Sequence, residues 1–251
     1  MWPAVARLRR TKIFFVRNYT GALHCPSRRT RTTTLRAVHC TTKVSRVTFV
    51  LHFLPLVLCL LSCQQTPPVL KIALAGPFEG QQRAIGYDAI YSARLAVREI
   101  NQAGGIGAYR LALVSLDDGG DPALAAEVAD SLALDPAVVA VIGHWLPTTT
   151  AASRPIYRGA GLPFIAAGER PFTETAPDHL PANFHTAYAA VTPFEEIAGP
   201  YAGPAYDAFY LLAAAMKQIV EQEQEINRET LSAVLQNLHY EGITGDVYQP
   251  Q

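Results

Sequence analysis

Cysteine is scarce in this 251-residue sequence, which has four, and the last of them is Cys63. The residues after Cys63 therefore cannot form a disulfide with one another or a cysteine-ligated metal site. That stretch also lacks the G-x-S-x-G elbow of serine hydrolases and a glycine-rich phosphate loop. Its histidines do not show the paired spacing of a zinc protease; they are His144, His179, His185 and His239. We therefore expect a protein that is not an enzyme and has no cofactor.

Acidic residues are absent from positions 1–63, which carry eleven lysines and arginines. Residues 64–251 carry ten lysines and arginines against twenty-one aspartates and glutamates, a net charge of −11. This acidic body argues against nucleic acid as a partner. Residues 1–45 are basic and of low complexity, which indicates either a leader or a start codon assigned too early, so we do not expect them to belong to the folded body.

The apolar run at residues 47–62 is shorter than the roughly 20 residues of a membrane-spanning helix, and Pro55 interrupts it. A basic flank, a short apolar run and a small residue before a cleavage point indicate a secretory signal. Its end, "LLSCQQ", resembles the lipobox of bacterial lipoproteins, with Cys63 as the lipid acceptor. The alternative is an uncleaved membrane anchor. Both interpretations place the body outside the cytoplasm and attach it to a membrane.

Compact apolar runs alternate with amphipathic segments in the first part of the body. Strands are expected at residues 69–76, 109–118, 137–143 and 161–168, and helices at 84–103, 121–134 and 148–158. This order predicts right-handed βαβ units, and hence an α/β fold: a Rossmann-like parallel sheet with helices on both faces. Three further helices are expected at 184–191, 203–224 and 227–238, followed by a short strand within 240–249.

Four stretches of the body resemble, in this order, the extracytoplasmic solute-binding proteins of branched-chain amino-acid ABC transporters, the periplasmic-binding-protein type I group. They are "INQAGGIGAYRLALVSLDDGGDP", "VIGHWLPTTTAASRPIYRGAGLPFIAAG", "GPYAGPAYDAFYLLAAAM" and "YEGITGDV". The ordered set is more specific than any one motif, and it spans most of residues 69–249. The resemblance implies two α/β lobes joined by three crossovers, with the ligand between them.

One part of the family pattern is missing. In the family the chain builds a second lobe after the strand equivalent to 161–168, whereas here the segment resembling its return begins near Phe184, about fifteen residues after Glu169. This gap is too short for a lobe, because one βαβ crossover alone needs about ten or more residues. We therefore expect a leader and signal at 1–63, a linker at 64–68, and a single α/β lobe at 69–251 with a shortened loop at 169–183.

The resemblance places the ligand's carboxylate and amine in the loops after the third and fourth strands. A strand that leads into a helix N-terminus presents free N–H groups to an anion, and hydroxyl groups add donors. The expected ligand contacts are Phe78 and Glu79 in the first loop, Trp145 and Leu146 as an apolar wall, Thr148 and Thr149 as donors, and Ala167 and Glu169 in the last loop.

A purely structural role is the alternative at several of these positions. One of the threonines at 148–150 would only cap the helix, and Glu169 would pair with Arg170 in solvent. Pro147 removes one N–H donor where the family has a hydroxyl residue.

A metal site is one interpretation of three nearby aspartates, Asp117, Asp118 and Asp121. Their spacing lacks the alternation and the terminal glutamate of a calcium loop. A turn followed by a helix cap explains them better, so no metal is expected.

The sequence thus predicts a membrane-anchored, extracytoplasmic substrate-binding protein that takes an amino acid or amide and serves an ABC permease. Binding would be non-covalent, and weak because one lobe supplies only half of the contacts. The alternative is a non-transport interaction module or a non-functional remnant of such a protein, since a lone lobe exposes apolar loop faces. A hydrolase on the same sheet is the third hypothesis.

Overall fold

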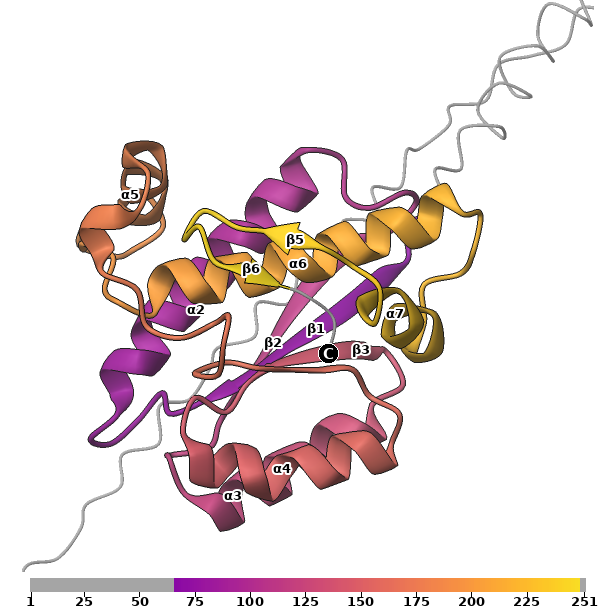
Figure 1. Ribbon diagram of the computed structural model, residues 1–251, viewed down its shortest axis with the longest axis horizontal. Coiled ribbons are helices and arrows are strands. Elements are labelled where there is room, and N and C mark those ends of the chain that lie inside the picture. Colours follow the sequence, from indigo (N-terminus) through magenta and orange to yellow (C-terminus); the bar gives the residue numbers. More distant parts are fainter. Residues whose placement is uncertain (1–65, 249–251) are drawn as a thin grey trace, which may run out of the picture. The chain divides into compact units, whose positions relative to one another are not determined.

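The structure, a computed structural model, describes residues 66–248 (Figure 1). The expected leader, the signal segment and Cys63 lie outside the described residues. The first part of the chain contains β1 (Val69–Gly76), α2 (Arg83–Gln102), β2 (Arg110–Asp117), α3 (Pro122–Leu134), β3 (Val138–Gly143), α4 (Pro147–Gly159) and β4 (Phe164–Ala166). The second part contains the 3-10 turn η1 (Pro177–His179), α5 (Ala182–Ala189), α6 (Ala202–Glu221), α7 (Arg228–Leu235), β5 (Tyr240–Glu241) and β6 (Val247–Tyr248). Within 66–248, no helix combines the length and the apolar character needed to cross a membrane.

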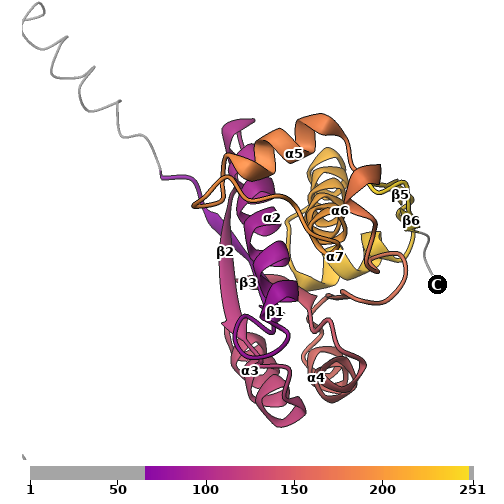
Figure 2. The same cartoon turned by 90° about the vertical axis from the view of Figure 1, so that its left-hand side faces the viewer.

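Strands β1 to β4 form one parallel sheet in the order β2-β1-β3-β4. The central strands β1 and β3 are buried almost throughout, as continuous apolar parallel strands covered on both faces should be. Helices α3 and α4 pack together on one face, while α2, α6 and α7 cover the other (Figure 2). The predicted α/β fold, a Rossmann-like parallel sheet with helices on both faces, is confirmed.

The long helix α6 is held by the apolar stripe that its sequence shows. The stripe residues are all buried in the core shared with α2: they are Phe209, Leu212, Ala213, Met216 and Ile219. Burying a side chain of this size contributes about 1.5–3 kcal/mol relative to exposure. The stripe thus accounts for the position of α6 against the sheet.

Strand β4 is shorter than the apolar run at 161–168 indicates. It pairs with β3 only from Phe164 to Ala166. Gly161, with a φ of 60°, turns the chain before the strand, and Gly168, with a φ of 85°, turns it away again. These left-handed conformations, which glycine adopts readily, limit the strand at both ends.

The connection into α6 is held by a half-buried carboxylate on α2. Asp88 accepts a hydrogen bond from the N–H of Tyr201 at 3.1 Å. Burial raises the pKa of Asp88 to about 6, and the nearby charge of Glu196 adds to the shift, although the N–H groups of Tyr201 and Gly199 oppose it. The folded chain therefore holds a proton on Asp88 at a pH where the unfolded chain has released it.

We expect this group to make stability depend on pH. The contribution of Asp88 to the free energy of unfolding is fully present below its pKa in the unfolded chain, about 3.9. This contribution is lost as the pH rises through the pKa in the folded chain, about 6. An Asp88→Asn variant stays neutral, so its melting temperature relative to the unchanged chain should rise by a few degrees between pH 4 and pH 7. Thermal unfolding at both pH values measures this difference. Asp130→Asn, at an exposed position on α3, is the control, and a difference for Asp88→Asn that does not change with pH would contradict the assignment.

Two polar anchors attach the C-terminal segments to the lobe. Asn227 and Thr230 form a capping box at the start of α7. The guanidinium of Arg228 donates to the carbonyl oxygens of Val138 at 2.9 Å, Ala133 at 3.2 Å and Asp135 at 2.6 Å. The cap at Asn227 involves neighbouring residues, whereas the role of Arg228 has no sequence signal because its partners are about ninety residues away.

The second anchor is Asp207, which is buried within α6. Its carboxylate accepts hydrogen bonds from the N–H of Ile243 at 2.9 Å, the N–H of Thr244 at 3.0 Å and the hydroxyl of Thr244 at 2.7 Å. These bonds hold the turn between β5 and β6 against α6. Two of the stretches that carry the family resemblance, "GPAYDAFY" and "YEGITGDV", are thereby joined in space.

Candidate binding site

The carboxyl ends of the parallel strands lie at one edge of the sheet. In the strand register Gly76 stands beside Asp117, and Gly143 stands beside Ala166. The loops that follow these residues therefore come together, as loops at the carboxyl edge of an open α/β sheet do. This edge is the candidate binding site, and it contains the four loops that follow β1, β2, β3 and β4.

The first loop is held by Asp117. Its carboxylate accepts hydrogen bonds from the N–H groups of Phe78 at 2.8 Å, Gly119 at 2.9 Å and Glu79 at 3.4 Å. Phe78 is half-buried and Glu79 is exposed. The loop therefore has a fixed backbone and an exposed carboxylate at its surface.

The aspartates after β2 stabilise the turn into α3 by accepting hydrogen bonds from backbone N–H groups. Asp118 accepts from the N–H of Gly120 at 2.9 Å, and Asp121 caps α3 by accepting from Ala123 at 2.8 Å and Leu124 at 2.9 Å. The interpretation as a turn with a helix cap is confirmed. Among residues 66–248, no three His, Cys, Asp or Glu side chains are grouped so that they could hold a metal ion.

The third loop differs from expectation in where its helix begins. The N-cap of α4 is Leu146, which has no capping side chain, so the alternative that a threonine caps the helix is wrong. Pro147 suits the first helical position and thereby places all three threonines inside the first turn. The first backbone hydrogen bond of this helix is donated by the N–H of Thr150 to the carbonyl of Leu146 at 2.9 Å.

The two threonines expected to contact a ligand lie in different environments. Thr148 is exposed, whereas Thr149 is buried and its hydroxyl donates to the carbonyl of Leu146 at 3.0 Å. Thr148 and Thr149 precede the first helical hydrogen bond, so their N–H groups have no partner within the helix. The surface therefore presents the hydroxyl and N–H of Thr148, while the hydroxyl of Thr149 is already used.

The expected apolar wall is mostly part of the core. Trp145 is only 5% exposed and packs with the cluster beneath α2 and α6. Its indole Nε1 is buried without a hydrogen-bond partner in the described part of the chain. Leu146 is half-buried and lies close to Gly120, so it stays at the surface of the loop.

The fourth loop contains an ion pair with a different partner from the one expected. Glu169 pairs with Arg154 of α4 through two contacts of 2.5 and 2.6 Å, and the alternative that it pairs with Arg170 is wrong. The two residues are distant in sequence, but β4 runs beside α4 and brings them together. Ala167 is 2% exposed and donates its N–H to the carbonyl of Gly143 at 3.1 Å, so it supports the loop.

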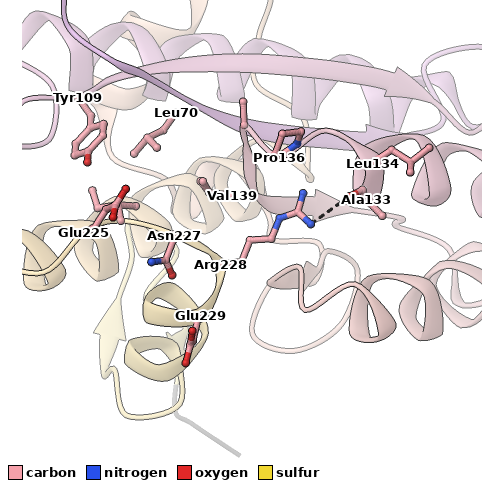
Figure 3. A pocket seen from close by; sticks show the side chains of 12 residues that line it. Leu70, Tyr109, Ala133, Leu134, Pro136, Val139, Glu225, Asn227, Arg228 and Glu229 are labelled. Atoms are coloured by element: carbon pink, nitrogen blue, oxygen red, sulfur yellow. Dashed lines mark hydrogen bonds between the residues drawn. The ribbon is translucent and has the colours of Figure 1, made fainter.

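Two of the cavities formed by residues 66–248 do not coincide with this edge, although one of them reaches the fourth loop. The larger, of 540 Å³, is at the amino ends of β1 and β3, beside the N-terminus of α7, where Figure 3 shows Arg228 directed toward Ala133. The smaller, of 350 Å³, lies between β4 and α7. Glu169 lines the smaller cavity, and within residues 66–248 the other seven expected contacts line neither of the two.

Comparison with known proteins identifies the family. The family model described as periplasmic binding protein matches residues 69–199, just over half of the chain. The Leu/Ile/Val-binding protein of Escherichia coli K12 is 30% identical over 172 residues, which cover 67% of this chain and 44% of that protein. The leucine-, isoleucine-, valine-, threonine- and alanine-binding protein of Pseudomonas aeruginosa is 31% identical over 134 residues, 53% of this chain and 34% of that protein. The chain spans less than half the length of these curated relatives.

Solved structures agree with this assignment at the level of the fold. One is the branched-chain amino acid transporter substrate-binding protein of Streptococcus pneumoniae in complex with isoleucine. It has a TM-score of 0.59 and 16% identity, over 71% of this chain and 91% of that chain. The putative branched-chain amino acid ABC transporter protein of Rhodospirillum rubrum has the same TM-score and 17% identity, over 71% of this chain and 92% of that chain. From its sequence match and its fold, the chain belongs to the periplasmic binding protein family.

Proposed function

We propose that this chain is the extracytoplasmic substrate-binding protein of an ABC importer for branched-chain amino acids or related amides. Family membership supports this role, and the matched relatives are named for binding leucine, isoleucine and valine. The observation that carries the proposal is the carboxyl edge of the sheet, where α4 begins with N–H groups that have no partner within the helix. An ABC permease would be the partner, and a lipid on Cys63 or an uncleaved signal segment would hold the protein to the membrane.

The ligand would be held without covalent chemistry. Its carboxylate would accept hydrogen bonds from the N–H and the hydroxyl of the exposed Thr148, where the dipole of α4 also favours a negative charge. The buried Thr149 would support this turn through its bond to the carbonyl of Leu146. Its ammonium group would lie near the exposed carboxylate of Glu79 or that of Glu169. Phe78 and Leu146, both half-buried, would contact the aliphatic side chain. Trp145 and Ala167 would support these loops from below.

We further propose that residues 69–251 form a single lobe and bind weakly. The connection from β4 to α5 contains only the short turn η1. A ligand on one lobe stays open to water on its other side, so about half of the contacts of a closed clamp are lost. For leucine and the full chain we expect a dissociation constant in the millimolar range, about −4 kcal/mol of binding free energy.

Amide shifts in NMR titrations of the full chain with leucine, isoleucine and valine test both parts of this proposal. Shift changes should concentrate at residues 76–80 and 143–149. Micromolar or tighter binding would contradict the single-lobe proposal, and shifts absent from this edge would contradict the site.

A charge substitution separates binding from folding. Thr148→Glu would place a carboxylate where the ligand carboxylate binds, and it should abolish the leucine-induced shifts. It should not destabilise the chain, because an acidic residue in the first turn of a helix is favourable. Thr148→Gln, which is similar in size but neutral, should retain binding within about threefold, a change of under 1 kcal/mol. Equal effects of the two variants would show that the carboxylate does not bind at α4.

A further inference from the structure

Three titratable side chains form a buried row directly beneath the third loop. Asp118 follows β2, His144 follows β3, and Tyr157 lies in α4; each of them is 0% exposed. Nδ1 of His144 is 2.8 Å from the carboxylate of Asp118, and Nε2 of His144 is 2.9 Å from the hydroxyl of Tyr157. The row therefore joins two strand ends to one helix by side chains alone.

The hydrogen-bonding capacity of the row determines the direction of each bond. Tyr157 has one hydroxyl hydrogen, and its partner within residues 66–248 is His144. If the hydroxyl donates to Nε2, then Nδ1–H can donate to the Asp118 carboxylate, and every group is satisfied with a neutral imidazole. A doubly protonated imidazole would instead leave the tyrosine hydrogen without an acceptor. Burial, with the charge of Asp118, raises the pKa of Tyr157, which keeps its hydroxyl a donor.

The backbone at His144 is also under unusual constraint. Its φ is 49°, a left-handed value that is uncommon for a residue with a side chain. The N–H of His144 donates to the carbonyl of Ala75 at 2.9 Å, and its own carbonyl accepts from the hydroxyl of Thr150. Such a conformation persists only where its surroundings hold it, and the side-chain row provides that support.

We propose that Asp118, His144 and Tyr157 are positioning residues that hold the loop from His144 to Pro147 and thereby aim the N-terminus of α4 at the carboxyl edge of the sheet. Only two residues separate His144 from Pro147, so a rotation at His144 would redirect the N–H groups of Thr148 and Thr149. The row lies under the loop and does not touch the ligand. What the loop binds rests on the function proposed above, whereas the positioning itself can be tested without ligand.

The test compares two tyrosines in the full chain. Tyr157→Phe removes the hydroxyl that bonds His144, and Tyr188→Phe removes a hydroxyl from an equally buried ring on α5. Amide hydrogen exchange without ligand should accelerate at least about tenfold at His144 and Thr150 in Tyr157→Phe, beyond any change in β1. Tyr188→Phe should not accelerate these amides selectively. Asp118→Asn, whose side-chain oxygen can still accept from Nδ1–H, should have an intermediate effect.

Two further readouts follow the same variants. The ring nitrogen shifts of His144 at neutral pH should show an unprotonated Nε2 and a protonated Nδ1. The leucine dissociation constant should rise at least about fivefold in Tyr157→Phe and stay within twofold in Tyr188→Phe, where fivefold is about 1 kcal/mol.

The outcomes distinguish the two proposals. Equal exchange at His144 and Thr150 in both tyrosine variants would overturn the positioning role, whereas two protonated nitrogens on the ring would overturn the assigned directions of the hydrogen bonds. If the unchanged chain shows no response to leucine, the proposed ligand fails, and the exchange measurement still decides whether the row positions the loop.

Discussion

Replacing Gly143 with alanine is expected to destabilise the lobe by roughly 3–5 kcal/mol. Gly143 ends β3 with a φ of 151°, a value that residues with a side chain rarely adopt. A Cβ at this position would also overlap the backbone of Ala75 in β1, where rigid neighbouring strands cannot separate. The energetic costs of backbone strain and of steric overlap therefore add. Chemical denaturation with a linear extrapolation measures the resulting loss in the free energy of unfolding.

Gly159→Ala is the matched control for that experiment. Gly159 ends α4, has no positive φ, and has no atoms near the position of an added Cβ. Alanine there should be neutral or stabilising by up to about 1 kcal/mol, because it reduces the freedom of the unfolded chain. A Gly143→Ala protein that unfolds at the same denaturant concentration as Gly159→Ala would refute the close approach of β1 and β3.

The second large loss of stability is expected when Asp207 is replaced. Asp207→Ala leaves the N–H groups of Ile243 and Thr244 and the hydroxyl of Thr244 without their acceptor, at a cost of about 2–4 kcal/mol. Because this carboxylate holds the turn between β5 and β6, the loss should appear first as faster amide exchange in residues 240–248. Global unfolding and residue-resolved exchange together measure it.

Two substitutions check the cause of that loss. Asp207→Asn keeps one acceptor oxygen but directs an amide NH2 at a donor, so it should cost less than Asp207→Ala and more than zero. Asp246→Ala, at an exposed aspartate of the same hairpin, should change stability by less than about 0.5 kcal/mol. If Asp207→Ala leaves exchange in the hairpin unchanged, Asp207 does not anchor it.

Local signals in the sequence were sufficient for the order and type of the main elements. Apolar runs and helical periodicity depend on neighbours a few residues apart, and the caps at Asp121 and Asn227 involve groups within three residues. Boundaries were less well predicted where glycine or proline decides them. The three-residue β4 and the N-cap at Leu146 are the two examples.

For the candidate site, the sequence indicated which loops lie together but not how their side chains are directed. The carboxyl edge follows from the alternation of strands and helices, so the loops that form it could be named from the sequence. The directions of the side chains could not, because Trp145 and Thr149 sit at the inner side of their turns while Thr148 sits outside. Asp207, the single aspartate of the largely apolar helix α6, was a usable signal of a buried polar anchor, but its partners could not be named from the sequence.

By itself the sequence determined the family and the succession of strands and helices, and these led to the edge of the sheet that we propose for ligand binding. Only the tertiary structure decided which polar side chains from distant parts of the sequence contact one another. Asp118 and His144 are 26 residues apart, and Arg154 and Glu169 are 15 apart. Each pair forms because the register of the parallel strands places the strand ends and the helices that follow them next to one another. Local sequence does not encode that register, which results from packing all four strands between two layers of helices.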